Sequence, residues 1–93
     1  MIKVNEYFDG KVKSLAHELK GHPFSVGIME KGEYTFGTQT EELMEVVNGE
    51  MEVILPDENE KKTYCKGDHF KVPANKEFKV TVTDPVSYIC YYN

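Results

Sequence analysis

The carboxylate of Glu42 follows a run of alternating aromatic and hydroxyl side chains. Tyr34 and Phe36 come first, then Thr38 and Thr40, and Glu42 lies two residues further on. Aromatic rings can stack on any nucleobase, and hydroxyls can bind sugar or phosphate oxygens. A carboxylate beside them could grip sugar hydroxyls or stabilise positive charge on a sugar ring. The alternative is an ordinary strand pattern, with the aromatic rings in the core and the threonines at a strand edge. Glu42 would then be a carboxylate hydrogen-bonded inside the fold or part of the solvated acidic run Glu41-Glu42.

A second segment, GDHFKVPANKEF at residues 67–78, ends on an apolar ring. His69 precedes Pro73 in this segment, and Asn75 and Phe78 follow it. We expect His69 to face solvent at a turn and Phe78 to form a dry wall, which strengthens electrostatic contacts nearby. One carboxylate without imidazoles is a poor site for zinc, iron or copper, because these metals need three or four nitrogen, sulfur or oxygen ligands. We therefore expect no metal cofactor.

A phosphate group would have to be held without arginine, because the sequence contains none. Lysine, histidine or backbone N–H groups remain as phosphate ligands. Lys13, within an alternating run, and His22, just before a proline, are the candidates. The alternatives are that Lys13 lies on an exposed strand face and that His22 belongs to a surface loop.

Size and charge limit the class of protein. A chain of 93 residues with a net charge of −5 is predicted to form one domain over residues 1–93. The acidic balance argues against a nucleic-acid polymer or an anionic membrane as partner, and no apolar run approaches the ~20 residues of a membrane span. The two cysteines, Cys65 and Cys90, do not make a disulfide framework, so we expect a reduced cytoplasmic protein.

Strand periodicity extends along the whole chain, and helical periodicity is nearly absent. Residues 78–82 alternate strictly between apolar and other side chains. Asn48-Gly49 separates two apolar runs and predicts a two-residue hairpin, because both turn residues adopt positive φ. Turn signals recur every 8–12 residues. This pattern predicts eight or nine antiparallel strands in a sandwich or barrel, with the first eight residues pairing with another element or a second subunit.

The two segments resemble the paired motifs of the cupin superfamily, which are small β-barrels. The first runs from Gly32 through Glu42 to Gly49, and the second starts 18 residues later at Gly67. In cupins each motif supplies two strands and a turn, and inward side chains of both converge in the mouth of a cup. The resemblance implies an all-β fold, a single antiparallel cupin β-barrel of jelly-roll type.

The metal ligands of cupins are largely missing from these positions. Glu42 corresponds to the glutamate of metal cupins, whereas Phe36, Thr38 or Thr40 take the place of the upstream histidines. Phe78 stands where the second motif has its histidine. The resemblance therefore covers the spacing of the two motifs, whereas most of the residues that bind metal in cupins are replaced in this sequence.

Short blocks along the chain resemble a narrower group, the pyrimidine/purine nucleoside phosphorylase family of single-domain cupins. The resemblance extends from Asn5 to Tyr92 in nearly constant order and spacing, in the blocks Asn5-Glu6-Tyr7-Phe8, Gly10-Lys11-Val12-Lys13-Ser14, Ser25-Val26-Gly27, Gly32-Glu33-Tyr34-Thr35-Phe36, Leu55-Pro56-Asp57, Val72-Pro73 and Ser87-Tyr88. It implies a broad-specificity homodimeric enzyme that uses inorganic phosphate, and no metal, to split nucleosides into free base and pentose 1-phosphate. A non-enzymatic cupin that binds a sugar or nucleoside is the alternative.

The last predicted strand supplies one more candidate residue. Tyr88 shares a face with Cys90 and Tyr92, so a tyrosine could reach the cup, although packing or a dimer surface is the alternative. The predicted site thus has Glu42 as its catalytic residue. Its phosphate ligands are Lys13 and His22, and its substrate-binding residues are Tyr34, Phe36, Thr38, Thr40, Phe78 and Tyr88.

Overall fold

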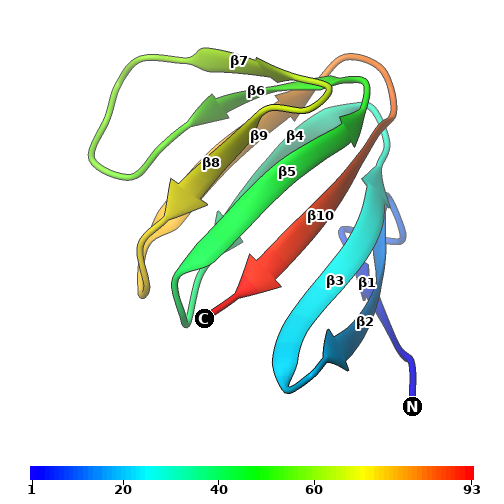
Figure 1. The fold of residues 1–93 in the computed structure, drawn as a ribbon. Helices are drawn as coiled ribbons and strands as arrows, with labels where there is room; N and C mark the ends of the chain where they lie inside the picture. The colour runs from blue at the N-terminus through cyan, green and yellow to red at the C-terminus, as the bar shows by residue number, and fades with distance from the viewer.

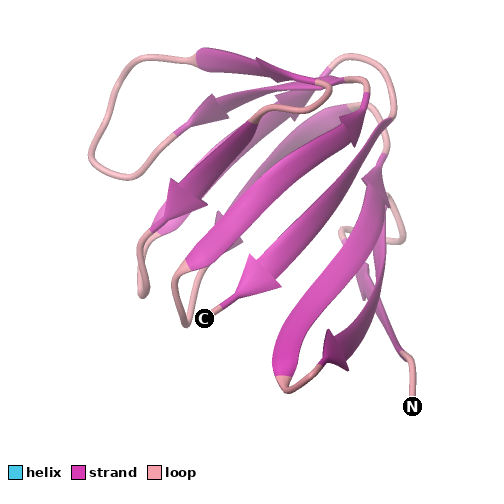
Figure 2. Ribbon diagram, viewed as in Figure 1, coloured by secondary structure: helices cyan, strands magenta, loops and turns pink.

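The computed structural model describes residues 1–93 and consists of ten β-strands without a helix (Figures 1 and 2). The strands are β1 (Lys3–Tyr7), β2 (Val12–Leu19), β3 (His22–Met29), β4 (Gly32–Gly37), β5 (Glu42–Asn48), β6 (Glu50–Ile54), β7 (Lys62–Cys65), β8 (His69–Val72), β9 (Glu77–Val82) and β10 (Val86–Tyr92). Every strand pair is antiparallel, which confirms the predicted fold class. The structure has no helix with the length and apolar character that a bilayer crossing requires.

The strands form two sheets that face each other. The six-stranded sheet has the order β1-β2-β3-β10-β5-β8, and the four-stranded sheet has the order β4-β9-β6-β7. In Figure 1 the six-stranded sheet lies toward the viewer and β4 and β9 run behind it. From β3 to β10 the chain changes sheet at every step except between β6 and β7. Eight strands arranged in this way form a jelly roll, as predicted.

The core lies between the two sheets because alternate side chains of each strand point inward. In β9 the inward residues Phe78, Val80 and Val82 are buried, and in β5 Met44 and Val46 are buried. They belong to a single cluster of buried apolar side chains drawn from both sheets. Full burial of such a side chain stabilises the fold by about 1.5–3 kcal/mol. The alternation of apolar and polar residues in the sequence therefore corresponds to side chains that point alternately into the core and out of the sheet.

The prediction of a two-residue hairpin at Asn48-Gly49 was wrong. β5 pairs with β10 and β8, whereas β6 pairs with β9 and β7. Only Gly49 has positive φ, at 89°, and a Cβ atom there would lie 3.1 Å from the carbonyl oxygen of Pro85. The two residues carry the chain from one sheet to the other, and glycine is required both for the backbone conformation and for the close approach.

β1 and β2 extend the jelly roll beyond its eight strands. The first residues pair with another strand of the same chain, which was one of the two predicted alternatives. Val4 of β1 lies opposite Leu15 of β2. The turn after β1 has three successive residues with positive φ, Phe8, Asp9 and Gly10. A bulky aromatic residue rarely adopts this conformation. The turn is held by hydrogen bonds from the N–H of Gly10 to the Tyr7 carbonyl and from that of Lys11 to the Phe8 carbonyl, 3.2 Å each.

Candidate functional site

A cavity of about 430 Å³ opens between the inner faces of the two sheets. Its walls come from inward side chains of β2 to β5, β9 and β10, from the β4–β5 connection and from Tyr7 and Phe8 at the end of β1. The volume falls in the range of small-molecule sites, ~300–1,000 Å³. Five of the predicted site residues line it, namely Phe36, Thr40, Glu42, Phe78 and Tyr88.

Glu42 is the only acidic side chain that lines this cavity. It begins β5 and lies opposite Tyr92 of β10. The thiol of Cys90 donates a hydrogen bond to its carboxylate Oε1 at 3.4 Å. Burial raises the pKa of Glu42 above its ordinary value, and the hydrogen bond from the thiol acts in the opposite direction. The cavity therefore contains one carboxylate, half withdrawn from water and contacted by a neutral donor.

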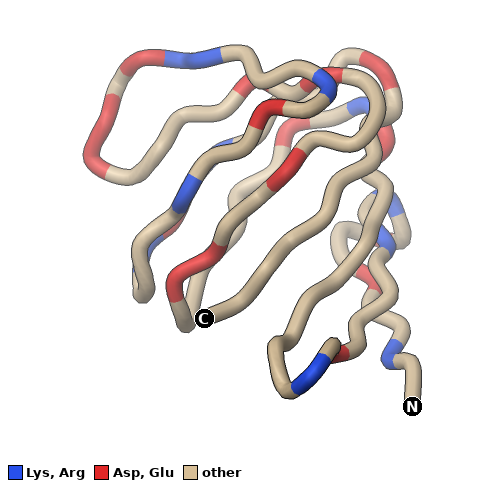
Figure 3. Tube along the Cα trace, viewed as in Figure 1, with Lys and Arg blue, Asp and Glu red and all other residues tan.

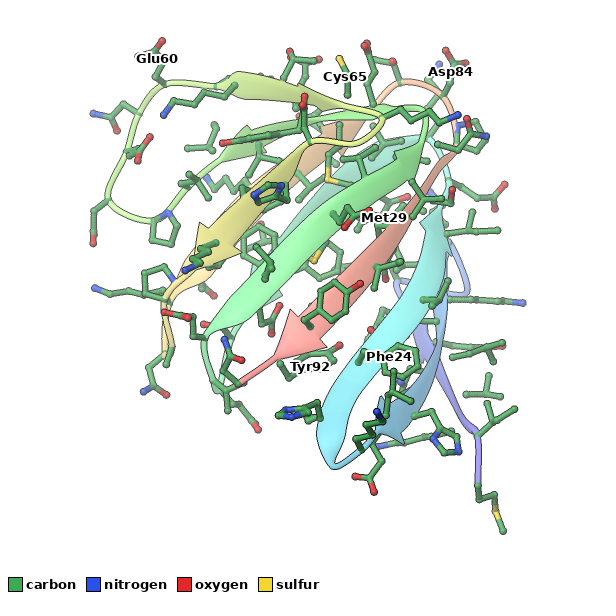
Figure 4. The ribbon with its side chains drawn as sticks, in the orientation of Figure 1. Phe24, Met29, Glu60, Cys65, Asp84 and Tyr92 are labelled. Carbon is green, nitrogen blue, oxygen red and sulfur yellow. The ribbon has the colours of Figure 1, made fainter.

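Strand β10 contributes three protonated donors to the same cavity, and one of them, Cys90, contacts the carboxylate. Tyr88, Cys90 and Tyr92 alternate along the strand and all line the cavity, so the predicted shared face is present. Burial raises the pKa of each of these three groups, so all remain protonated near neutral pH. The hydroxyl of Tyr92, labelled near the end of β10 in Figure 4, lies 2.8 Å from Ser25 Oγ. The groups can share or donate hydrogen bonds to sugar or phosphate oxygens.

A glycine in β3 makes room for the ring of Tyr88. Gly27 lies opposite Tyr88 in the β3–β10 pairing. A Cβ atom on Gly27 would lie 2.6 Å from the Tyr88 hydroxyl oxygen and 2.8 Å from the carbonyl oxygen of Lys13. The absence of a side chain at this position therefore allows Tyr88 to lie flat against the inner face of the sheet, where it forms one wall of the cavity.

Aromatic rings form the apolar side of the cavity. Phe36 stacks on Phe78 with ring centroids 5.6 Å apart, and Phe8 meets Phe36 edge-on at 5.5 Å. Phe78 is almost fully buried, whereas Phe8 is 43% exposed at the cavity mouth. Phe78 is therefore in the position expected of a dry wall. The ring of Phe36 beside it is partly exposed, so a planar ligand could stack on it.

Tyr34, predicted to bind substrate, does not line the cavity. Its ring is buried in the core, and its hydroxyl donates a hydrogen bond to the carbonyl oxygen of Glu30 at 2.6 Å. Phe8 packs against it with ring centroids 5.0 Å apart. Its position supports a packing role, which was the alternative interpretation.

Thr38 also lies outside the cavity and is buried. Its Oγ1 donates a hydrogen bond to the Pro73 carbonyl at 2.6 Å and accepts one from the Lys76 N–H at 3.1 Å. Its backbone carbonyl accepts a further hydrogen bond from the Asn75 N–H at 3.0 Å. Thr38 therefore ties the β4–β5 connection to the β8–β9 connection.

The two predicted phosphate ligands lie away from the cavity. The neighbouring Ser14 lines it, so Lys13 points to the opposite face of β2, where its Nζ lies 3.5 Å from Glu6 Oε1 in an exposed ion pair. His22 is exposed at the start of β3. No lysine, arginine or histidine lines the cavity.

Sequence reasoning did not assign several residues that line the cavity, among them Tyr7, Phe8, Ser14 and Gln39. Gln39 lies between the candidates Thr38 and Thr40. Its carboxamide can donate and accept hydrogen bonds, so its residue type could have marked it as a ligand-binding residue. Tyr7 ends β1 and Phe8 begins the turn after it, and no periodicity in the sequence indicates that turn.

The site does not fit the transition metals that cupins often hold. No three His, Cys, Asp or Glu side chains are grouped so as to hold a metal ion. The cavity offers only the Glu42 carboxylate and the Cys90 thiol, and the thiol keeps its proton against that carboxylate. Zinc, iron and copper sites need more ligands than this. The expected absence of a metal cofactor stays a prediction.

Two facing sheets in jelly-roll order with a cavity between them form a cupin-type fold. A solved RmlC-like cupin from Shewanella frigidimarina has the same fold, with a TM-score of 0.77 over 98% of this chain and 82% of its own, at 20% sequence identity. The likeness confirms the predicted fold.

The chain belongs to the pyrimidine/purine nucleoside phosphorylase family, whose sequence profile matches residues 2–92. It is similar to a Pseudomonas aeruginosa protein named pyrimidine/purine nucleoside phosphorylase, with 47% identity over 92 residues and 99% of each chain covered. It is also similar to a crystal structure of a protein of unknown function from Vibrio parahaemolyticus. That structure has a TM-score of 0.97 and 45% identity, and 100% of this chain and 99% of the other are covered. The family resemblance seen in the sequence is confirmed.

Proposed function

We propose that this protein is a nucleoside phosphorylase that splits purine and pyrimidine nucleosides with inorganic phosphate into free base and pentose 1-phosphate. The observation that carries the proposal is the half-buried carboxylate of Glu42 among protonated tyrosine and cysteine donors, in a cavity with an aromatic wall. The names of the relatives support the same reaction class.

In this reaction a phosphate oxygen forms a bond to the anomeric carbon as the bond from that carbon to the base nitrogen breaks. The electron pair of the broken bond leaves with the base, which takes up a proton. By analogy with glycoside hydrolysis, the sugar becomes positively charged in the transition state. The Glu42 carboxylate would stabilise that charge, and its effect is larger in a partly dry cavity than in water.

Phosphate would be bound by neutral donors rather than by cations. Lys13 and His22 lie away from the cavity of a single chain, so their predicted role has no support from their positions. Hydroxyls of Thr40, Ser14 and Tyr92 line the cavity and could donate to phosphate oxygens. These donors would have to hold phosphate against the repulsion of Glu42, so they would favour its monoanion.

The reaction as proposed needs no metal cofactor and suits a reducing cytoplasm. Phosphate and nucleoside are the only ligands required, because the chemistry consists of positioning and charge stabilisation. Both cysteines are free: Cys65 is exposed and Cys90 is buried in the cavity wall.

We further propose that the protein is a homodimer joined through the outer face of the six-stranded sheet. Val4, Leu15, Val26 and Ile89 are successive cross-strand neighbours on this face, and the first three are 64%, 51% and 44% exposed. The central strands β3 and β10 contain no charged residue, and they are tan throughout in Figure 3. Phe24, labelled on β3 in Figure 4, extends the same face.

A second copy of this chain is the partner that this face would bind. Six strands ~4.8 Å apart and about seven residues long give a face of roughly 24 by 23 Å, or about 550 Å² in projection. A standard interface buries about 800 Å² on each partner, so the edges of the sheet would have to contribute the remaining contacts. The uncharged centre of this face, between the Glu6–Lys13 ion pair on one side and Glu45 on the other, can meet the same centre of another chain across a two-fold axis. The two cavities would then lie on the far sides of the interface.

Base release from inosine and uridine, with and without phosphate, tests the proposed reaction. We expect free base and pentose 1-phosphate only when phosphate is present. Addition of EDTA should not change this result. Failure to release base at high protein concentration, after EDTA treatment and after metal addition alike, would contradict the proposal.

The second candidate function is non-enzymatic binding of a nucleoside or sugar. The absence of a cationic side chain from the cavity lining is the observation that favours it, since phosphate would then have no strong ligand. Saturable nucleoside binding without any phosphate-dependent release of base would support this candidate.

A further inference from the structure

Gln39 is a solvent-exposed residue of the β4–β5 connection that also lines the cavity. It is the only carboxamide among the lining residues, and none of the side-chain hydrogen bonds in the protein involves it. An amide offers a carbonyl acceptor and an N–H donor side by side in one plane. Gln39 therefore has both groups free for a ligand.

The backbone on both sides of Gln39 is held in place. Thr38, directly before it, makes the hydrogen bonds to the β8–β9 connection described above. Glu41, two residues after it, accepts hydrogen bonds from the backbone N–H and the side-chain amide of Asn93, at 3.0 and 3.2 Å. The loop is therefore braced on both sides, while the side chain between them remains free to rotate.

The two groups of the amide match the edges of nucleobases. Inosine and uridine present a carbonyl oxygen beside a ring N–H, whereas adenosine and cytidine present an amino group beside a ring nitrogen. Glutamine can pair with such an edge through both of its groups at once. A half-turn about the last side-chain bond exchanges donor and acceptor, so one residue can satisfy either arrangement.

The short chain segment between Gln39 and Glu42 keeps the two side chains within the reach of one nucleoside. Three residues of extended chain span at most about 11 Å, which is the scale of a nucleoside from the base edge to the sugar. Phe36 lies in the same cavity wall and offers a ring on which the base could stack. A base near Gln39 would thus leave the sugar near Glu42.

We propose that Gln39 binds the hydrogen-bonding edge of the base, and that rotation of its amide allows one cavity to accept purine and pyrimidine nucleosides. The proposal rests on the proposed function, because it identifies the base-binding part of the same site. It assigns specificity to a residue that takes no part in the breaking of the glycosidic bond.

Binding measured by calorimetry without phosphate tests this role. The ligands are inosine and purine riboside, a purine nucleoside that lacks the 6-oxygen. Gln39→Leu keeps the approximate size of the side chain and removes both polar groups. We expect about 10-fold weaker binding of inosine and less than about threefold weaker binding of purine riboside. Gln39→Glu, which keeps acceptors and loses the donor, should also weaken inosine binding.

Glu41→Leu is the matched control, since it changes the same loop at a side chain that does not line the cavity and keeps the backbone hydrogen bond from the Asn93 N–H. It should leave inosine binding within about twofold of the wild type. Equal weakening of both ligands by Gln39→Leu, an equal effect of Glu41→Leu, or no saturable binding of inosine to the wild type would overturn the role of Gln39. The expected binding pattern without phosphate-dependent base release would instead contradict the phosphorylase reaction and leave the base-binding role intact.

Discussion

The thiol of Cys90 donates a hydrogen bond to the Glu42 carboxylate across 3.4 Å, although 48 residues separate the two in the chain. The contact joins neighbouring strands, β10 and β5, at the cavity wall. It places the one acidic group of the cavity against a donor that keeps its own proton. A carboxylate held in this way is suited to stabilise positive charge nearby.

Glu42→Gln should lower the turnover of nucleoside by at least tenfold, because it removes the negative charge and keeps the shape of the side chain. Stopped assays of base release from inosine at saturating phosphate measure this. Glu45→Gln is the control, since Glu45 lies on the same strand and does not line the cavity, and it should leave turnover unchanged. Unchanged kinetics of Glu42→Gln would remove Glu42 from the reaction.

The stability of the protein should depend on pH through Glu42. Burial raises its pKa in the folded state above the ordinary value of 4.5, so the folded state favours the protonated carboxyl. This stabilisation is complete below pH 4.5 and is lost as the pH rises through the higher folded pKa. The Tm of Glu42→Gln relative to the wild type should therefore increase between pH 4 and pH 8 in thermal unfolding. A difference that stays constant with pH, or that falls, would argue against a desolvated carboxylate.

The strands of the fold could be read from the sequence, but their assignment to sheets could not. Period-two alternation marks a strand with one buried face, as in β9, whichever strands it pairs with. Asn48-Gly49 has the composition of a hairpin turn, yet the chain crosses there to the other sheet. The crossing brings Gly49 close to the Pro85 carbonyl, which is distant in sequence, so no local pattern indicates it.

Only part of the candidate site could be predicted, because alternation gives the direction of a side chain on a regular strand but not in a connection or a turn. Glu42, Phe36 and Phe78 lie on regular strands, where alternation gives the direction of the side chain. Thr38 follows the end of β4, where the alternation stops, and its hydroxyl turns to backbone groups of a distant connection. Phe8 depends on a turn with positive φ, which its residue type does not favour.

Thr38→Val should destabilise the fold by about 1–3 kcal/mol, because it keeps the shape of the side chain and removes two part-buried hydrogen bonds, to the Pro73 carbonyl and from the Lys76 N–H. Chemical denaturation measures this change. Thr38→Ser retains the hydroxyl and should cost less than about 1 kcal/mol. If Thr38→Val left the free energy of unfolding unchanged and affected only substrate binding, the original substrate-binding interpretation of Thr38 would be correct.

Val26→Lys should convert the proposed dimer to monomers, because it places a charge in the centre of the apolar outer face of β3. Sedimentation velocity over a range of protein concentrations measures the oligomeric state. Thr63→Lys adds the same charge to an exposed position on β7, in the other sheet, and should leave the dimer intact. A wild-type protein that is monomeric at all concentrations would refute the dimer, and a dimeric Val26→Lys variant would place its interface elsewhere.

Gly27→Ala should destabilise the fold by about 1–3 kcal/mol, because the added methyl group would lie 2.6 Å from the Tyr88 hydroxyl oxygen. The ring of Tyr88 would have to move into the cavity, so base release should slow as well. A double-mutant cycle with Tyr88→Leu separates the ring contact from the backbone contact. The cost of Gly27→Ala should shrink in the Tyr88→Leu background. It should not vanish, since the carbonyl oxygen of Lys13 would still lie 2.8 Å from the new carbon. Additive effects in this cycle would mean that Tyr88 does not require the glycine.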